Sequence, residues 1–360
     1  MPNDRFVLFC AGEDSGDCIG ESLVKAVVAD GRLNAVGAGG ARMQTAGMLS
    51  IVNYETLPVS GFGDVLPKYL KLRQSFNTLK AALESPQCLG LIAIDYPGFN
   101  MKLVKRAGEL HKPVLYVAPP QVWAWKKKRA AELAENPCVK LAVFFDFEER
   151  VYREVGCNVV RVQHPFINSE FRIQNSEFRN PNSAFRILLL PGSRKSQAFR
   201  NLPIFLKAVQ DVSDVLVIAA RQELVPAFEK FGVQVAVAPQ NAEERKSLYQ
   251  TAKYAITAPG TATLELALAG CPMVVCTKPD LLTYCLGRLF IKTKYFALPN
   301  IIMNRRVFPE YIMTPFSRDD VEIESLEDVS AELREKLAVG QTLEELALEF
   351  LGQFVERKPE

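Results

Sequence analysis

The chain has 360 residues, which at ~100–200 residues per domain predicts two or three domains. Hydrophobic residues make up 48% and charged residues 23% of the sequence, and the formal net charge of +2 gives no reason to expect a nucleic-acid-binding protein. Eight cysteines without a C-x-x-C pair argue against a zinc ribbon, and two histidines are too few for a histidine-rich metal site.

Short apolar segments alternate with amphipathic segments throughout the first half of the chain. We predict strands at residues 5–11, 35–37, 89–94, 114–118, 140–145 and 159–162. The spacing of apolar residues between them predicts helices at 16–29, 66–83, 100–110, 121–134 and 147–155. This alternation is typical of βαβ units, so the first half is predicted to form a parallel, doubly wound sheet.

The alternation stops at residues 168–184, where a seven-residue near-repeat of the pattern Asn-Ser-(Glu/Ala)-Phe-Arg occurs. Each copy has one phenylalanine and no second apolar seam position, which is poor material for a coiled coil, so we interpret 168–185 as a polar, low-complexity linker. It separates a predicted N-terminal domain at 1–167 from a C-terminal domain at 186–324. Residues 325–360 have helical apolar spacing and are predicted to form closing helices.

The second half resumes the alternation of strands and helices. Its predicted strands lie at 187–190, 215–219, 233–238, 254–257 and 273–276, and its predicted helices at 198–212, 223–231, 242–252, 262–268 and 281–291. The expected fold class is therefore α/β, with two doubly wound, Rossmann-like domains. Such sheets bind ligands at the carboxyl ends of their strands, so we expect a ligand cleft between the two domains.

Two glycine-containing turns of the second half are candidate anion sites, although no G-x-G-x-x-G or P-loop motif occurs. Pro-Gly-Ser-Arg follows the strand at 187–190, and Pro-Gly-Thr-Ala-Thr-Leu-Glu follows the strand at 254–257. Backbone N–H groups at such turns and at helix N-termini bind anions, and arginine pairs with phosphate oxygens. The residues in question are Gly192, Ser193, Arg194, Gly260, Thr261, Ala262 and Thr263, with Glu265 as an acceptor for ribose hydroxyls. The alternative is two ordinary turns, with a threonine capping the second helix.

Asp95 ends the predicted strand at 89–94, in the segment Ile-Asp-Tyr-Pro-Gly-Phe-Asn. A carboxylate at the carboxyl end of a buried strand is typical of acid–base groups in α/β enzymes. The alternative is that Asp95 caps the helix that follows. His164 precedes a proline at the predicted domain boundary, where a hinge residue is more typical than a catalyst, and it is a minor candidate.

Two segments combine apolar or aromatic residues with cations. One covers residues 57–73, and the other places Trp123 and Trp125 directly before four cations. Such stretches suit a membrane surface, and ordinary core-facing helices with a basic outer side are the alternative. The longest weakly charged stretch, at 255–277, contains two prolines and a glutamate, so we expect no membrane-spanning segment.

Several motifs follow one another in the order found in lipid-A-disaccharide synthases, and the chain resembles that family from residue 6 to about 310. They are AGEDSGD at 11–17, GGARMQTAGM at 39–48, VSGFGDVLPKYLKL at 59–72, IDYPGFN at 94–100, QVWAW at 121–125, PGSR at 191–194, PGTATLE at 259–265 and LPNI at 298–301. The resemblance implies the GT-B architecture, in which two α/β domains border a cleft.

The resemblance implies an inverting glycosyltransferase that joins UDP-2,3-diacylglucosamine to 2,3-diacylglucosamine 1-phosphate, giving the β-1,6 lipid A disaccharide 1-phosphate and UDP. Asp95 is then the expected base for the acceptor's 6-hydroxyl, with Glu13 and Asp17 as rivals. UDP is expected to bind the two turns described above and Asn300, without a metal or other cofactor. The expected acceptor-facing or membrane-facing residues are Leu66, Tyr69, Leu70, Asn100, Trp123 and Trp125.

The same resemblance implies a cytoplasmic protein peripheral to the inner membrane, with no nucleic-acid partner, and it leaves open whether the chain forms a homodimer. Gly98, Gln163 and Pro259 depart from the residues usual in the family. Two alternative functions remain at this stage. One is another UDP-sugar enzyme of GT-B architecture, such as an epimerase or a peptidoglycan N-acetylglucosaminyltransferase, and the other is a non-catalytic UDP-sugar-binding paralogue.

Overall fold

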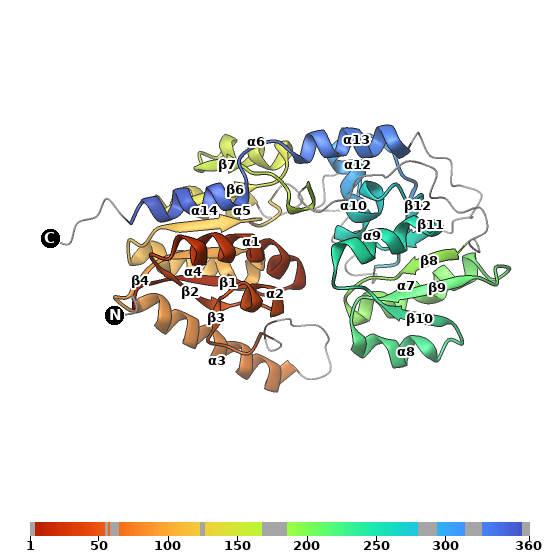
Figure 1. The fold of residues 1–360 in the computed structure, drawn as a ribbon, viewed down its shortest axis with the longest axis horizontal. Coiled ribbons are helices and arrows are strands. Elements are labelled where there is room, and N and C mark those ends of the chain that lie inside the picture. Colours follow the sequence, from red (N-terminus) through yellow and green to blue (C-terminus); the bar gives the residue numbers. More distant parts are fainter. Residues whose placement is uncertain are drawn as a thin grey trace. The chain divides into compact units, whose positions relative to one another are not determined.

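The computed structural model describes residues 4–54, 57, 65–122, 127–167, 186–279, 294–313 and 326–354 (Figure 1). The chain divides into two compact units. The first comprises Met1–Pro165 together with Ala338–Glu360, and the second comprises Phe166–Leu337. The first unit is therefore built from both ends of the chain.

The first unit contains a seven-stranded sheet in the order β3-β2-β1-β4-β5-β6-β7, with every neighbouring pair parallel. Its strands are β1 (Phe6–Ala11), β2 (Asn34–Ala38), β3 (Leu49–Ser50), β4 (Cys88–Ile94), β5 (Val114–Val117), β6 (Val139–Val143) and β7 (Val159–Arg161). Its helices are α1 (Asp14–Asp30), α2 (Ala41–Thr45), α3 (Val65–Glu84), α4 (Pro97–Glu109), α5 (Lys127–Ala134), α6 (Asp146–Glu154) and α14 (Leu343–Gly352).

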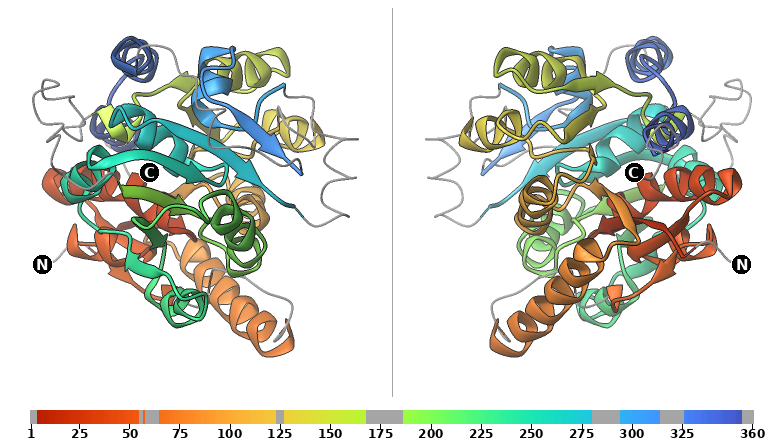
Figure 2. Two further views of the ribbon diagram at one scale, coloured as in Figure 1. Left: turned by 90° about the vertical axis from the view of Figure 1, so that its right-hand side faces the viewer. Right: turned by 90° about the vertical axis from the view of Figure 1, so that its left-hand side faces the viewer.

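Helices cover both faces of this sheet because its central strands, β1 and β4, are apolar along their whole length. Leu91 of β4 belongs to a buried cluster with side chains of α3, α4 and α5 on one face. A methyl group on the neighbouring Gly90 would meet Phe350 and Phe354, so α14 covers the opposite face, where it packs beside α1 (Figure 2). Because successive side chains of a strand point to opposite faces of the sheet, the central strands have buried side chains on both faces.

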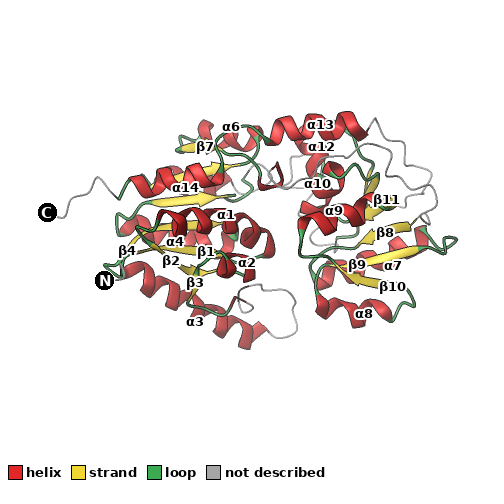
Figure 3. Cartoon of the chain, viewed as in Figure 1, coloured by secondary structure: helices red, strands yellow, loops and turns green. Residues whose placement is uncertain are grey.

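The second unit contains a six-stranded parallel sheet in the order β10-β9-β8-β11-β12-β13 (Figure 3). Its strands are β8 (Arg186–Leu190), β9 (Val215–Ala219), β10 (Gln234–Val237), β11 (Ala252–Thr257), β12 (Met273–Thr277) and β13 (Glu310–Ile312). Its helices are α7 (Lys195–Ala208), α8 (Val225–Glu229), α9 (Ala242–Gln250), α10 (Thr261–Leu268), α12 (Leu298–Met303) and α13 (Leu326–Leu337). Two short 3-10 helices, η2 (Pro165–Ile167) and η4 (Gln222–Leu224), complete the described elements.

The two parallel, doubly wound sheets confirm the predicted fold class. Short elements such as α2, β3, α12 and β13 were not predicted, because a few residues carry too little periodicity to be recognised. The helix predicted at 281–291 and the whole of the linker predicted at 168–185 lie outside the described residues. Of the two closing helices, α13 belongs to the second unit and α14 to the first.

In the part of the chain that the structure describes, no helix combines the length and the apolar character needed to cross a bilayer.

Candidate functional site

The order of strands reverses once in each sheet, and four of the motifs singled out in the sequence come at the ends of the strands on either side of these reversals. In the first sheet the reversal lies between β1 and β4, and in the second between β8 and β11. In open α/β sheets, ligands bind at the carboxyl ends of strands beside such a reversal. Asp95 in the first unit and the turns at Gly192 and Gly260 in the second therefore lie at the edge where this architecture binds ligands.

In the first unit, the loops after β1 and β4 come together beside Asp95. Ala11 pairs with Ile94 in the sheet register, so the segment that starts at Gly12 begins next to Asp95. Ser15, in the first turn of α1, donates a long hydrogen bond of 3.5 Å from Oγ to Oδ2 of Asp95. Ser15 was not predicted as a site residue, although it lies within the Gly-Glu-Asp-Ser-Gly-Asp motif.

The backbone around Asp95 is strained. Asp95 and Tyr96 have φ angles of 47° and 46°, a left-handed conformation that costs ~1–3 kcal/mol for each non-glycine residue. Two buried groups bind the Asp95 carbonyl: Asn100 donates from Nδ2 at 2.8 Å and the Tyr116 hydroxyl donates at 3.0 Å. The strained turn is thus held by surrounding side chains, as is typical of functional sites.

Asn100 was predicted to face the acceptor, but its side chain is fully buried below the turn. Its Nδ2 lies 3.1 Å from the carbonyl oxygens of both Cys10 and Ile94, in addition to its bond to Asp95. These carbonyls belong to the carboxyl ends of β1 and β4. Asn100 therefore connects the carboxyl ends of the two strands beneath the site, and its side chain is not exposed at the surface.

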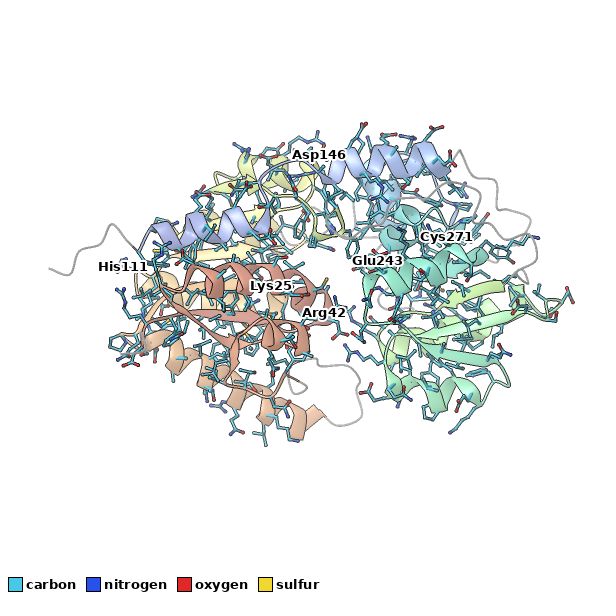
Figure 4. The ribbon with its side chains drawn as sticks, in the orientation of Figure 1. Lys25, Arg42, His111, Asp146, Glu243 and Cys271 are labelled. Carbon is cyan, nitrogen blue, oxygen red and sulfur yellow. The ribbon has the colours of Figure 1, made fainter. Side chains whose placement is uncertain are left out.

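Asp17, predicted as a rival base, is 6% exposed and accepts hydrogen bonds from the backbone N–H groups of Arg42 and Met43 at the start of α2. A methyl group on Gly40 would collide with this carboxylate, which explains the glycine. Burial raises the pKa of Asp17 above its ordinary value, while the backbone hydrogen bonds oppose that shift. Figure 4 labels Arg42, which lies on α2 after β2 and so at the same sheet edge.

Glu13, the other rival, occupies the N-cap position of α1 and is partly buried, and its side chain makes no capping hydrogen bond. Tyr96 packs its ring against Gly12, where a methyl group would collide with it. The Tyr96 hydroxyl donates to the Leu57 carbonyl at 2.6 Å, and burial raises its pKa to about 12. The loops after β1 and β4 are thus packed directly against one another.

In the second unit, the two predicted anion turns are neighbours. Leu190 pairs with Thr257 in the sheet register, and the N–H of Ala258 donates to the Leu190 carbonyl at 2.9 Å. Gly192 and Gly260 have φ angles of 117° and 155°, which only glycine adopts without strain. Sequence reasoning predicted these turns separately, and the sheet places them side by side.

The predicted UDP-binding side chains differ in exposure. Ser193 and Arg194 are exposed before the first turn of α7, and Thr261 is exposed at the start of α10. Thr263 is buried and donates to the Gly260 carbonyl at 2.7 Å, so it folds back on the turn. The N-cap residue of α10 provides no side-chain cap for the N–H groups of that helix.

A buried asparagine that was not predicted, Asn201, supports the Pro-Gly-Ser-Arg turn. Its Nδ2 donates to the Pro191 carbonyl at 2.9 Å, and its Oδ1 accepts from the Lys278 N–H at 2.8 Å and the Thr277 hydroxyl at 3.3 Å. It therefore joins the turn after β8 to the end of β12. A single asparagine inside an amphipathic helix gives no sequence signal for this role.

Glu265, predicted to bind ribose, is 8% exposed and forms an ion pair with Arg245 of α9 at 3.0 Å. The Tyr249 hydroxyl donates to its other oxygen at 3.2 Å, and burial raises the pKa of that phenol. Arg245 also donates to the carbonyls of Pro239 and Gln240. The carboxylate thus connects α10 to α9 and, through Arg245, to the loop before α9.

Asn300, predicted to contact UDP, is fully buried and its amide is fully engaged. Its Oδ1 accepts from the N–H groups of Val307 and Phe308, both at 2.9 Å. Its Nδ2 donates to the Phe308 carbonyl at 2.8 Å and to Glu310 at 2.9 Å. Because an amide offers two donors and two acceptor positions, this arrangement uses its whole capacity.

The predicted membrane-facing residues are only partly described. The side chains of Leu66 and Tyr69, and Trp123 and Trp125 entirely, lie outside the described part. Leu70 on α3 is 58% exposed. Among the described residues, no three histidine, cysteine, aspartate or glutamate side chains group so that they could hold a metal ion.

His164, the minor candidate, is buried between aromatic rings. Its ring centroid lies 4.8 Å from that of Phe144 and 6.1 Å from that of Phe145. Burial lowers its pKa to about 3, and the positive charge of Arg161 contributes. A neutral imidazole packed in this way is a structural element of the first unit.

Comparison with known proteins identifies the family. The family model of lipid-A-disaccharide synthetase matches residues 7–358. The chain is 33% identical to the lipid-A-disaccharide synthase of Geobacter metallireducens over 98% of both chains. It is 31% identical to lipid-A-disaccharide synthase 1 of Legionella pneumophila over 95% of both.

Solved structures show the same fold at low identity. The glycosyltransferase SnogD from Streptomyces nogalater superposes with a TM-score of 0.52 at 15% identity, covering 97% of this chain and 99% of its own. The MnaA–UDP co-structure from S. aureus gives a TM-score of 0.61 at 10% identity, covering 99% of both. The fold is thus that of GT-B glycosyltransferases, and the chain belongs to the lipid-A-disaccharide synthase family, which makes it a glycosyltransferase of lipid A biosynthesis.

Proposed function

We propose that this chain transfers 2,3-diacylglucosamine from UDP to the 6-hydroxyl of 2,3-diacylglucosamine 1-phosphate, releasing UDP and the β-1,6-linked lipid A disaccharide 1-phosphate. The observation that carries the proposal is that each sheet has two of the family motifs at its point of strand reversal. One such edge carries a strained aspartate, and the other carries two adjacent turns suited to an anion.

In the first unit, Asp95 acts as the general base. An α-linked donor that gives a β-linked product requires a single in-line displacement, and the attacking hydroxyl must lose its proton to a nearby group. The left-handed turn at Asp95 and Tyr96 directs the carboxylate, while Asn100 and Tyr116 hold its backbone. Ser15 contacts the same carboxylate and stabilises its orientation.

In the second unit, the turns at Gly192 and Gly260 bind the pyrophosphate of UDP. Negative charge develops on the leaving group, and backbone N–H groups at the start of α10 together with the guanidinium of Arg194 stabilise it. Glu265 binds the ribose by exchanging its contact with Tyr249 or Arg245 for the ligand's hydroxyl groups. We propose that no metal takes part, so activity persists in excess EDTA.

The acylated substrates require contact with a membrane. We propose that the protein works at the cytoplasmic face of the inner membrane, as a peripheral protein. The exposed Leu70 and the basic segments predicted at 57–73 and 123–129 support this placement. Cosedimentation with anionic and neutral vesicles tests it, and equal recovery with both would contradict an electrostatic contribution.

The decisive experiment is mass spectrometry of the product that the purified chain forms from the two acylated substrates. A disaccharide 1-phosphate and an equal amount of UDP are expected. UDP released from non-acylated UDP-N-acetylglucosamine instead would favour another UDP-sugar enzyme, an alternative that the family relationship does not favour. UDP binding without any product would favour a non-catalytic paralogue.

A further inference from the structure

A groove between helices α3 and α4 of the first unit reaches the turn that follows the candidate base. It has a volume of about 260 Å³, just below the ~300–1,000 Å³ typical of small-molecule sites, and so has room for part of a ligand. Tyr96 lines it and is the residue that follows Asp95 in the chain. Its lining includes Arg73 and Phe76 of α3, Tyr96, and Gly98, Phe99 and Lys102 of α4.

The inner wall of the groove is aromatic. Phe99 stacks on Tyr96 with ring centroids 5.3 Å apart and meets Phe76 edge-on at the same distance. Phe99 is buried, whereas Phe76 and Tyr96 are partly exposed and present ring surface to the groove. Such a wall binds a hydrocarbon chain by burying apolar area.

Both charged side chains that line the groove are cations. Arg73 and Lys102 are exposed, and Lys102 Nζ lies 5.8 Å from the centroid of the Phe76 ring. Within the described part of the chain neither forms an ion pair, and no carboxylate lines the groove. Exposed Leu70, one turn before Arg73 on α3, extends the apolar surface beyond the cations.

We propose that this groove is the acceptor subsite: an acyl chain of the phosphorylated acceptor lies along Phe76, Tyr96 and Phe99, and Arg73 and Lys102 bind its phosphate. The groove is complementary to this acceptor, which combines hydrocarbon chains, a phosphate and the hydroxyl that Asp95 must deprotonate. The inference rests on the proposed function, since it names the subsite for one of the two substrates.

The charge part is tested with Arg73→Glu, Lys102→Glu and the double variant, with Lys105→Glu as the matched control. Lys105 is exposed on the same helix as Lys102 but does not line the groove. Loss of a charge-assisted contact should raise KM for the 1-phosphate acceptor ~10-fold or more in each single variant. KM for the donor and kcat should stay within ~2-fold of wild type, and the melting temperature should stay within a few degrees of it.

A dephosphorylated acceptor distinguishes the phosphate contact from a general effect. Its KM should be nearly the same in wild type and in the charge-reversal variants. If both acceptors lose affinity equally, or if Lys105→Glu has the same effect as Lys102→Glu, the assignment of the phosphate to these cations is overturned.

The hydrocarbon part is tested by filling the groove. A Cβ at Gly98 meets no atom within 4 Å, so Gly98→Leu adds a side chain to the groove lining without a backbone clash. KM should rise ~10-fold for long-chain acceptors and little for short-chain ones. Gly352→Leu, at another unobstructed glycine, is the matched control. An equal rise for all chain lengths would exclude an acyl subsite.

Equilibrium binding of the 1-phosphate acceptor in the absence of donor separates this proposal from the proposed function. If wild type forms no disaccharide but binds the acceptor in a manner that depends on Arg73 and Lys102, the groove proposal stands and the function fails. If disaccharide forms normally in every groove variant, the function stands and the groove proposal fails. If the charge-reversal variants lose binding to phosphatidylglycerol vesicles while their KM for the acceptor is unchanged, the two cations bind a membrane surface. That result also overturns the groove proposal.

Discussion

Asp95 combines three properties: a left-handed backbone, a carboxylate at a sheet edge and buried side chains that hold its carbonyl. The bonds from Asn100 and Tyr116 offset strain that a free loop would relieve by changing conformation. A base held in this way loses little conformational freedom when the acceptor binds, which favours its role in proton transfer.

Replacing Asp95 with Asn should lower kcat by ~100-fold or more, because the amide cannot accept the hydroxyl proton. The Kd for UDP, measured by calorimetry, should stay within ~2-fold, since the proposed UDP contacts lie on the second unit. Asp146→Asn, at an exposed carboxylate of α6, serves as the control and should behave as wild type. A loss smaller than 10-fold would transfer the role to Glu13.

Replacing Arg194 with Ala should weaken UDP binding by ~1.5–3 kcal/mol, the amount typical of a hydrogen bond to a charged group. Arg194 is exposed, so the melting temperature should change little. Titration of both proteins with UDP in a calorimeter measures the effect. Lys207→Ala, in the last turn of the same helix, is the control and should bind UDP as wild type does. If Arg194→Ala binds UDP as tightly as wild type, Arg194 does not contact UDP.

His164 should make the first unit sensitive to acid. Its ordinary pKa of 6.5 is lowered to about 3 by burial, so between these values the unfolded chain binds a proton that the folded chain does not. Its contribution to stability is therefore complete above pH 6.5 and is lost as the pH falls toward 3.

Between pH 7 and pH 5 the wild type should lose ~2 kcal/mol more of its free energy of unfolding than His164→Gln does. Urea titrations of both proteins at the two pH values measure this difference, and contributions from other groups cancel in it. Identical pH dependence in the two proteins would show that the imidazole is accessible to protons in the folded state.

At the scale of elements, both sites depend on how parallel strands align their carboxyl ends. Leu190 pairs with Thr257, and Ala11 pairs with Ile94, so loops that are far apart in sequence start side by side. The position of the loops then depends on buried polar side chains. Asn201 performs this task for the turn after β8, as Asn100 does for the turn after β4.

Asn201→Ala should destabilise the second unit by ~1–3 kcal/mol, because the Lys278 N–H and the Pro191 carbonyl lose a buried partner. It should also raise the Kd for UDP, whereas Arg194→Ala raises the Kd without loss of stability. Thermal unfolding and calorimetric titration separate the two effects. Unchanged UDP affinity in a folded Asn201→Ala protein would show that the turn keeps its shape without this contact.

At the scale of the whole molecule, the first unit is complete only when the end of the chain returns to it. Helix α14 buries Leu346 and Phe350 beside α1, and Lys140 of β6 forms a 2.6 Å ion pair with Glu349. Val162 also bridges to Gln341 just before this helix. The last segment of the chain is therefore part of the core that supports the proposed base.

Ending the chain after Leu337 should destabilise the first unit by several kcal/mol, because each buried leucine or phenylalanine contributes ~1.5–3 kcal/mol. Differential scanning calorimetry should show a lower transition temperature together with lower activity. The control ends after Phe354 and retains α14. If both truncated proteins unfold at the wild-type temperature, α14 does not contribute to the stability of the unit.

Much of this architecture was predictable because it depends on local patterns. Apolar segments of strand length alternate with helical periodicity, and this order leads to parallel sheets with their loops at the carboxyl edge. The residues just after those strands, Asp95 and the turns at Gly192 and Gly260, could therefore be named as candidates from sequence alone. Their family motifs led to the same positions, and the family is confirmed by the comparisons.

Other features arise only in the folded chain, because they join residues far apart in sequence. Ser15 reaches Asp95 across 80 residues, and Asn201 reaches Lys278 across 77. The groove between α3 and α4 exists because packing brings Phe76 against Phe99. Sequence periodicity records which side of an element is apolar, whereas the partner of each side chain is decided by tertiary packing, which also strains the turn at Asp95 and returns α14 to the first sheet.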